Sequence, residues 1–104
     1  LRGTVYRSSE QYEKALLDFN KLLQLEPDNA SAYLDRGKTY YLLNNFTQAL
    51  VDFEKAIHLE DGDPESYYFR AMSFKNLNQC EKAEVDFKKA CQMGDSDACT
   101  ETCP

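Results

Sequence analysis

Cysteines are the residues of this 104-residue sequence with the clearest capacity for covalent or metal chemistry. Cys99 and Cys103 are spaced i, i+4 and would share one face of a helix, while Cys91 precedes both. A disulfide from Cys91 to either Cys99 or Cys103 would join the end of the chain to the preceding segment in an oxidising compartment. Zinc is the weaker interpretation, because the sequence has no CxxC pair and its only histidine, His58, lies well before the cysteines.

Motifs that would support catalysis or cofactor binding are missing from the sequence. There is no glycine-rich phosphate loop, nucleophile elbow or metal-ligand motif. The acidic residues Glu60, Asp61, Asp63 and Glu65 do not have the spacing of alternating ligands around a central glycine that a calcium loop requires. Asn29-Ala30-Ser31 and Asn45-Phe46-Thr47 match the glycosylation sequon, but asparagine is also typical of turns. We therefore predict that the protein is not an enzyme and uses no cofactor.

The overall composition predicts a soluble, acidic domain. Twelve Lys and Arg against 18 Asp and Glu give a net charge of −6, which disfavours nucleic acid as a partner. A hydrophobic fraction of 42% is too high for a disordered chain. The longest uncharged stretch, Thr39–Val51, is shorter than the roughly 18 apolar residues of a membrane span. We expect no membrane partner and favour the cytoplasm, although cysteine usage does not decide the compartment.

An internal repeat in the sequence indicates which secondary-structure elements would hold the residues of a functional site. Residues 30–63 align without gaps with residues 64–97, an offset of 34, and the segment before residue 30 joins the same register. The recurring identities include Tyr33/Tyr67, Arg36/Arg70, Asn44/Asn78, Ala49/Ala83, Asp52/Asp86 and Phe53/Phe87, preceded by Arg2/Arg36, Gly3/Gly37, Tyr6/Tyr40, Ala15/Ala49, Asp18/Asp52 and Phe19/Phe53. The chain therefore contains two complete units and a shortened first unit.

Each unit has the apolar spacing of two helices joined by a turn. Ala49, Phe53 and Ala56 recur at i, i+4 and i+7, which is one face of a helix. The pairs Asn44-Asn45 and Asn78-Gln79 are compatible with turns between the two helices. Proline and glycine between the units end one helix and open the next. The predicted helices cover residues 1–8, 11–25, 30–43, 47–59, 64–77, 80–92 and 96–103.

Small and apolar residues recur at fixed positions of the repeat. Gly3, Gly37 and Ala71 share a position, which predicts a close approach of the two helices of each unit. Cys80 and Cys91 occupy positions that carry larger apolar residues in the other units, so we predict that both are core residues. One hairpin cannot bury its own apolar faces, and the units must therefore stack.

The recurring pattern resembles a known family. Tyr33-x2-Arg36-Gly37-x2-Tyr40 followed by Ala49-x3-Phe53-x2-Ala56 resembles the tetratricopeptide repeat, which has the same period and a helix pair in each repeat. The resemblance implies an all-α, right-handed superhelical solenoid of hairpins with a short C-terminal capping helix. It implies a single domain over residues 1–104. Its parts would be a truncated first repeat (1–29), a second repeat (30–63), a third repeat (64–97) and the cap (96–103).

Such arrays expose a concave groove formed by the first helix of each repeat, and the resemblance implies a protein or peptide ligand there. By helical periodicity, the first repeat would contribute Thr4, Arg7 and Ser8 to this groove. The partner-binding groove is predicted at Leu34, Asp35, Lys38, Tyr41, Tyr68, Phe69, Met72 and Lys75. Because other aromatic residues already fill the core positions, the apolar members of this set are surplus and predict an interaction surface.

Some members of the family clamp the C-terminal carboxylate of chaperones with Lys, Asn and Arg on these helices. The matching positions here carry Thr4, Asp35, Glu65 and Phe69. Two carboxylates thus occupy positions that would need hydrogen-bond donors or positive charge, which disfavours a clamp. We predict a non-enzymatic scaffold that binds an apolar or mildly basic peptide, or a partner helix. The alternative is a structural segment of a longer solenoid, or a homo-oligomerisation module.

Overall fold

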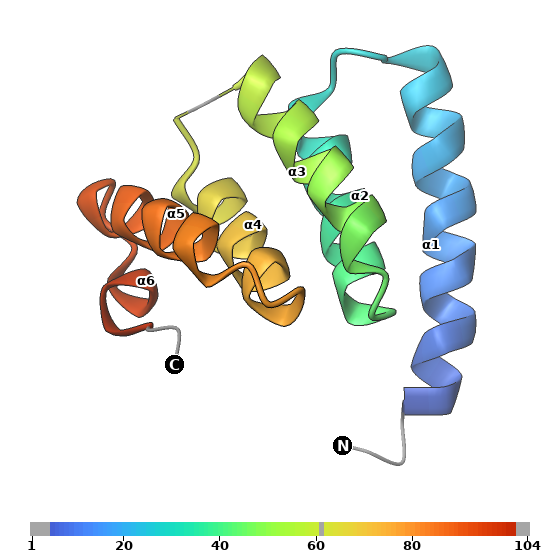
Figure 1. Ribbon diagram of the computed structural model, residues 1–104. Helices are drawn as coiled ribbons and strands as arrows, with labels where there is room; N and C mark the ends of the chain where they lie inside the picture. The colour runs from blue at the N-terminus through green and yellow to red at the C-terminus, as the bar shows by residue number, and fades with distance from the viewer. Residues whose placement is uncertain (1–4, 61, 102–104) are drawn as a thin grey trace.

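The structure is a computed structural model that describes residues 5–60 and 62–101, with side chains from residue 10 onward. Every regular element of this part of the chain is an α-helix (Figure 1). The helices are α1 (Val5–Leu25), α2 (Ala30–Leu42), α3 (Phe46–Leu59), α4 (Pro64–Asn76), α5 (Cys80–Gln92) and α6 (Ser96–Thr100). None of the described helices is both long and apolar enough to cross a membrane.

The helices stack in sequence order to form a short solenoid. α2 pairs with α3 and α4 pairs with α5, which gives the two predicted hairpins, and α3 packs against α4 to join them. α1 packs against α2 at one end of the array, and α6 packs against α5 at the other (Figure 1). The residues predicted to form the groove in repeats two and three therefore lie on α2 and α4, the first helix of each hairpin.

Local chemistry explains where these helices end. Asn44 and Asn78 adopt positive φ values of 63° and 61° directly after α2 and α4, a conformation that asparagine tolerates better than most residues. Gly94 takes the same role after α5, with φ of 108°. In each case the residue that follows donates its backbone N–H to the carbonyl five residues earlier, as in Asn45 N to Tyr40 O at 2.8 Å.

The helix starts use side-chain caps. Asn29 accepts a hydrogen bond from the Ala32 N–H at 3.0 Å at the start of α2. Asp63 accepts one from the Glu65 N–H at 2.9 Å at the start of α4. Such capping stabilises a helix by about 1 kcal/mol. This capping role explains why asparagine occupies position 29, which also belongs to a glycosylation sequon.

The first repeat differs from the prediction of two helices over residues 1–8 and 11–25. α1 is one continuous helix from Val5 to Leu25. The physical reason lies at Glu10, which stands 34 residues before Asn44. Glutamate has good helix propensity and does not readily adopt positive φ, so the residue that ends α2 has no functional equivalent here.

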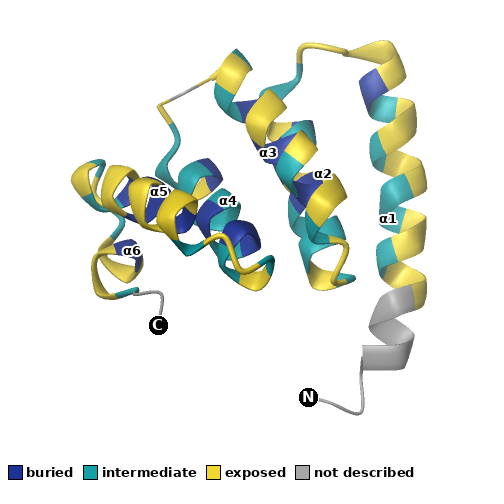
Figure 2. Ribbon diagram, viewed as in Figure 1, coloured by how far each residue is buried: buried dark blue, intermediate teal, exposed yellow. Residues whose placement is uncertain are grey.

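The core follows the small and aromatic repeat positions. One buried cluster contains Leu34, Ala49, Phe53 and Ala56 between α2 and α3. The equivalent cluster between α4 and α5 includes Ala71, Phe74, Ala83, Phe87 and Ala90, and Ala98 of α6 completes it. Figure 2 shows these buried positions on the faces that the paired helices turn toward each other. The predicted capping helix at 96–103 ends earlier, at Thr100, because Glu101 adopts an extended backbone.

Candidate binding groove

Ion pairs between a partly buried arginine and a buried aspartate join α2 to α3 and α4 to α5. Arg36 of α2 donates to Asp52 of α3 through Nε–Oδ2 at 2.8 Å and Nη2–Oδ1 at 2.7 Å. Arg70 of α4 and Asp86 of α5 repeat this bidentate geometry at 2.7 and 2.8 Å. Hydrogen bonding to the aspartate raises the pKa of each arginine, against the opposing effect of burial. These pairs orient α2 and α4, and with them the residues that the two helices present.

Aromatic side chains form a continuous strip between the second and third repeats. The Phe69 ring of α4 lies 5.8 Å from Tyr41 of α2, 5.4 Å from Tyr68 and 6.0 Å from Phe53. Tyr68 in turn lies 5.9 Å from Phe87. Tyr41, Tyr68 and Phe69 are each half-buried, so they pack on the core with one side and expose the other. This arrangement fixes their rotamers before any ligand binds, which lowers the entropic cost of binding.

Both predicted groove lysines contact acidic side chains. Lys38 Nζ lies 3.1 Å from Glu65 Oε1 and 5.1 Å from the centre of the Phe69 ring. Lys75 Nζ lies 3.3 Å from Glu101 Oε1. Asp35 is exposed on α2. Acidic groups thus balance or exceed the positive charge along the described part of this surface.

Carboxylates also surround the far end of the strip. The pKa of Tyr68 is raised by burial first, and then by Glu101, Asp97 and Asp95. These three acids follow α5, so the capping segment borders the groove at the third repeat. Neither Glu65 nor Glu101 belongs to the predicted set of partner-binding residues. Helical periodicity does predict that Glu65 faces the groove, although the predicted partner-binding set omits it, whereas the place of Glu101 depends on how the capping segment packs.

The predicted groove residues differ in how far their side chains are exposed. Asp35, Lys38, Tyr41, Tyr68, Phe69 and Lys75 retain exposed surface, and Met72 is half-buried against the core cluster of the third repeat. The prediction that Leu34 presents a surplus apolar side chain is wrong. Leu34 is only 7% exposed and belongs to the core between α2 and α3. Thr4, Arg7 and Ser8 lie outside the residues whose side chains the structure describes.

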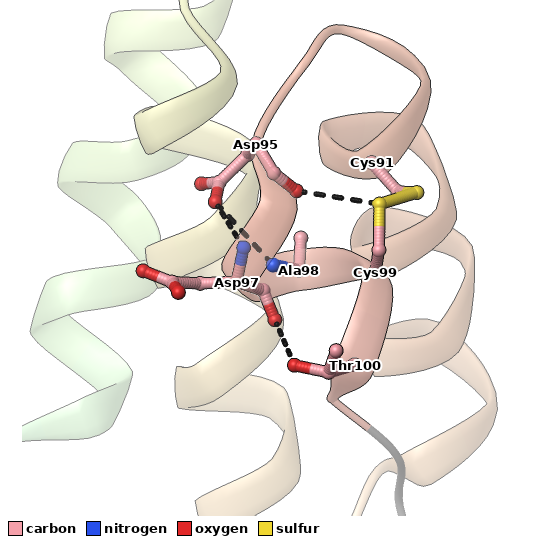
Figure 3. The surroundings of a disulfide bond; sticks show 6 residues. All are labelled: Cys91, Asp95, Asp97, Ala98, Cys99 and Thr100. Carbon is pink, nitrogen blue, oxygen red and sulfur yellow. Dashed lines mark hydrogen bonds between the residues drawn. A yellow bond between two sulfur atoms is a disulfide. The ribbon is translucent and has the colours of Figure 1, made fainter.

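A disulfide attaches the capping helix to the array (Figure 3). Of the two pairings that the sequence allowed for Cys91, the structure has the one with Cys99, with a Cα–Cα distance of 4.7 Å. Asp95 caps α6 by accepting hydrogen bonds from the Asp97 and Ala98 N–H groups at 3.0 and 3.3 Å. Its carbonyl oxygen lies 3.5 Å from Cys99 Sγ. Ala98 is buried against α5, so α6 is held by a covalent bond and by packing.

Two of the cysteines are less buried than the sequence predicted. Cys80 is half-buried rather than a core residue as predicted, and it is disulfide-bonded. Cys91 is half-buried rather than fully buried, as its bond to an exposed residue requires. Cys103 lies outside the described residues. Between residues 10 and 101, apart from residue 61, no group of three or more His, Cys, Asp or Glu side chains is arranged to hold a metal ion.

Comparison with known proteins agrees with this architecture. Two family models, both described as tetratricopeptide repeat, match residues 3–72 and 64–98. The chain therefore belongs to the tetratricopeptide repeat family. No curated protein sequence matches the chain.

Solved structures share the fold. The first TPR of Spaghetti (RPAP3), bound to the HSP90 peptide SRMEEVD, is 22% identical with a TM-score of 0.83, over 94% of this chain and 79% of that one. The Arabidopsis OM64 TPR domain is 24% identical with a TM-score of 0.83, over 92% and 80%. A thermophilic TPR protein of Thermus thermophilus is 26% identical with a TM-score of 0.79, over 89% and 48%.

Proposed function

We propose that this chain is a non-enzymatic protein-interaction module that binds an apolar or mildly basic peptide, or a partner helix, along α2 and α4. The observation that carries the proposal is the aromatic strip of Tyr41, Tyr68 and Phe69. Three adjacent rings, each packed on the core and exposed on the other side, provide rigid apolar area of the kind that dominates binding energy at protein interfaces. The flanking acids favour a ligand with positive charge.

The same surface is poorly suited to a terminal carboxylate. Asp35, Glu65 and Phe69 stand at three of the positions where the clamp needs donors or positive charge. Within the described part of the groove, the ammonium groups of Lys38 and Lys75 already contact Glu65 and Glu101. A carboxylate ligand would have to displace one of these contacts and approach other acids. We therefore propose that the module is not a carboxylate-clamp chaperone adaptor.

A random peptide display library selected on the folded chain tests the proposed groove. Selected peptides should be rich in apolar residues and should carry Lys or Arg. The double variant Tyr68→Ala/Phe69→Ala should weaken their binding by at least about 2 kcal/mol, or roughly 30-fold. Asp35→Lys, an exposed position without a packing role, should weaken the basic peptides without affecting the fold.

The control is Val85→Ala, because Val85 is exposed on α5 and lies outside the strip. Its affinity for the selected peptides should equal that of the wild type, and circular dichroism should show equal helicity for every variant. Unchanged affinity of a helical Tyr68→Ala/Phe69→Ala variant would remove the strip from the site. The peptide SRMEEVD tests the clamp separately. Binding of this peptide that is lost on removing its C-terminal carboxylate would contradict our exclusion of a clamp.

The disulfides also bear on where this module acts. Cys80, Cys91 and Cys99 are all disulfide-bonded. Structural disulfides persist in oxidising environments and are rare in the cytosol. We therefore propose an oxidising compartment in place of the cytoplasm favoured from the sequence. Quantifying the free thiols of protein isolated under alkylating conditions from its natural source tests this proposal, and fully reduced cysteines would contradict it.

A second candidate function is self-association, the alternative that the sequence left open. One observation favours it. α1 carries the core residues expected of the second helix of a repeat. Among the described helices, however, it makes extensive contacts only with α2.

A further inference from the structure

The capping segment supplies one of the two acids that pair with groove lysines. Glu101 directly follows α6, and its Oε1 lies 3.3 Å from Nζ of Lys75 on α4. Glu65, which pairs with Lys38 of α2, lies on α4 itself. The Lys38 and Lys75 side chains are almost equally exposed, at 32% and 31%. One pair therefore depends on the groove helices alone, whereas the other depends on where the capping segment lies.

The disulfide is the main constraint on the position of α6. This helix has five residues, and isolated helices shorter than roughly 12 residues are marginal in water. Among the described helices, α6 makes extensive contacts only with α5, and Ala98 is its one buried residue. Cys91 of α5 is bonded to the exposed Cys99 of α6 (Figure 3). Breaking this bond should therefore release α6 from α5 and separate Glu101 from Lys75.

The charge of the groove at the third repeat depends on this contact. Burial first, and then Glu101 and Asp97, raise the pKa of Tyr68, so both acids lie close enough to act on the aromatic strip. With the capping segment in place, these two acids outnumber the single positive charge of Lys75. Without it, Lys75 would be the nearest charged group to this end of the strip. The local charge would thus change from negative to positive.

We propose that Glu101 is a specificity-determining residue of the groove, and that the disulfide between Cys91 and Cys99 positions it. This inference rests on the function proposed for the groove. A Lys or Arg side chain of the ligand is attracted to Glu101 and to the ring of Tyr68. Opening the disulfide weakens basic ligands and strengthens acidic ones, because it removes Glu101 and leaves Lys75 unpaired. The bond thereby controls which ligands the groove selects.

The disulfide can be removed without changing a residue of the groove helices. Cys91→Ser/Cys99→Ser deletes the bond at two positions that lie outside α2 and α4. Serine variants are preferable to a reductant, because Cys80 is also disulfide-bonded and a reductant would open that bond as well. Glu101→Gln removes only the charge and keeps the disulfide. The two variants therefore separate the position of the capping segment from the charge that it carries.

Lysine reactivity tests the contact without any ligand. N-hydroxysuccinimide acetate acetylates lysine side chains, and mass spectrometry of the digested protein gives the rate at each one. Cys91→Ser/Cys99→Ser and Glu101→Gln should each raise the rate at Lys75 by roughly two- to fivefold, as expected when an exposed ion pair is lost. Lys38 is the internal control, and its rate should stay unchanged because Glu65 does not depend on the capping segment.

Peptide binding tests the specificity. The probes are a basic peptide selected on the wild type and the same peptide with each Lys and Arg replaced by Glu. Cys91→Ser/Cys99→Ser and Glu101→Gln should each weaken the basic peptide by roughly fivefold, and the ratio of basic to acidic affinity should fall by roughly tenfold. Combining the two should weaken the basic peptide no further than Cys91→Ser/Cys99→Ser does, because the charge has then already left the site. Glu65→Gln is the matched control, whose effect should add to that of Cys91→Ser/Cys99→Ser.

Two results would overturn the proposal while leaving the groove intact. An unchanged rate at Lys75 in Cys91→Ser/Cys99→Ser would show that the capping segment keeps its place without the bond. Equal binding of the basic peptide by Glu101→Gln and the wild type would show that this charge does not select the ligand. Unchanged binding by a helical Tyr68→Ala/Phe69→Ala variant would instead refute the proposed groove, and this inference with it.

Discussion

Gly37→Leu tests whether the close approach of the two helices of a hairpin determines stability. Gly37 lies on α2 directly opposite α3. A Cβ built at Gly37 would lie 2.7 Å from Cε1 and 2.9 Å from Cδ1 of Phe53, and 3.1 Å from Cβ of Asp52. Phe53 is fully buried, and Asp52 is fixed by its ion pair with Arg36. Neither neighbour can therefore move aside without disturbing the rest of the repeat.

The magnitude follows from two opposing contributions. Overpacking of a full core costs about 1–3 kcal/mol, and leucine adds three more carbons beyond the Cβ that already overlaps Phe53. Replacing a glycine within a helix recovers up to about 1 kcal/mol of helix propensity. Because the Cβ alone already overlaps Phe53, we take the upper end of the overpacking cost and expect a net loss of about 2 kcal/mol. With an m-value of about 1 kcal/mol per molar urea, the midpoint of unfolding should fall by about 2 M.

The assay is urea unfolding followed by far-ultraviolet circular dichroism. Gly62→Leu is the matched control, because nothing lies within 4 Å of a Cβ at Gly62 and the residue is exposed in the loop before α4. Its free energy of unfolding should stay within about 0.5 kcal/mol of the wild type. If Gly37→Leu keeps the wild-type midpoint with an unchanged m-value, the contact between α2 and Phe53 does not limit stability, and the packing argument fails.

Two further predictions concern the pairs that join helices. Asp52→Ala should lower the free energy of unfolding by about 3 kcal/mol in the same urea assay, because it leaves the partly buried Arg36 without its bidentate partner. A loss below about 1 kcal/mol would show that water hydrates the unpaired Arg36 at little cost. Cys91→Ser/Cys99→Ser should lower it by about 2.5 kcal/mol, the chain-entropy effect of opening a loop between residues eight apart. Hydrogen exchange should also become faster in α6 while exchange in α2 and α3 stays unchanged, and full protection of α6 in that variant would indicate that packing alone holds the cap.

The helices and their pairing could be predicted because their signals are local. Ala49, Phe53 and Ala56 define a helical face over one short segment, and the repeat places the same face at Ala83, Phe87 and Ala90. Asparagine at the end of a helix indicates a turn by its own backbone preference. The same rule explains the error in the first repeat. The identities in residues 2–19 suggested a hairpin, but Glu10 has no such preference, so α1 continues.

The exposure and contacts of the predicted groove residues followed from the sequence only in part, because helical periodicity gives the direction of a side chain but not which groups it contacts. Leu34 lies one residue before Asp35 on α2, yet the packing of α3 buries Leu34 and leaves Asp35 exposed. Periodicity placed Lys38 and Lys75 on the surface but could not show that Glu65 and Glu101 contact them. Glu101 in particular depends on where the disulfide holds α6.

The amino-acid sequence alone determined the period of the repeat, the helical class and the family, since each depends on residues close together in the chain or on a pattern that recurs along it. Only the tertiary structure decided that Cys91 pairs with Cys99, that Tyr41, Tyr68 and Phe69 form one aromatic strip, and that the groove lysines are already paired. Those features depend on distances between side chains from different helices. Such distances follow from how the helices stack, which no short segment of the sequence encodes.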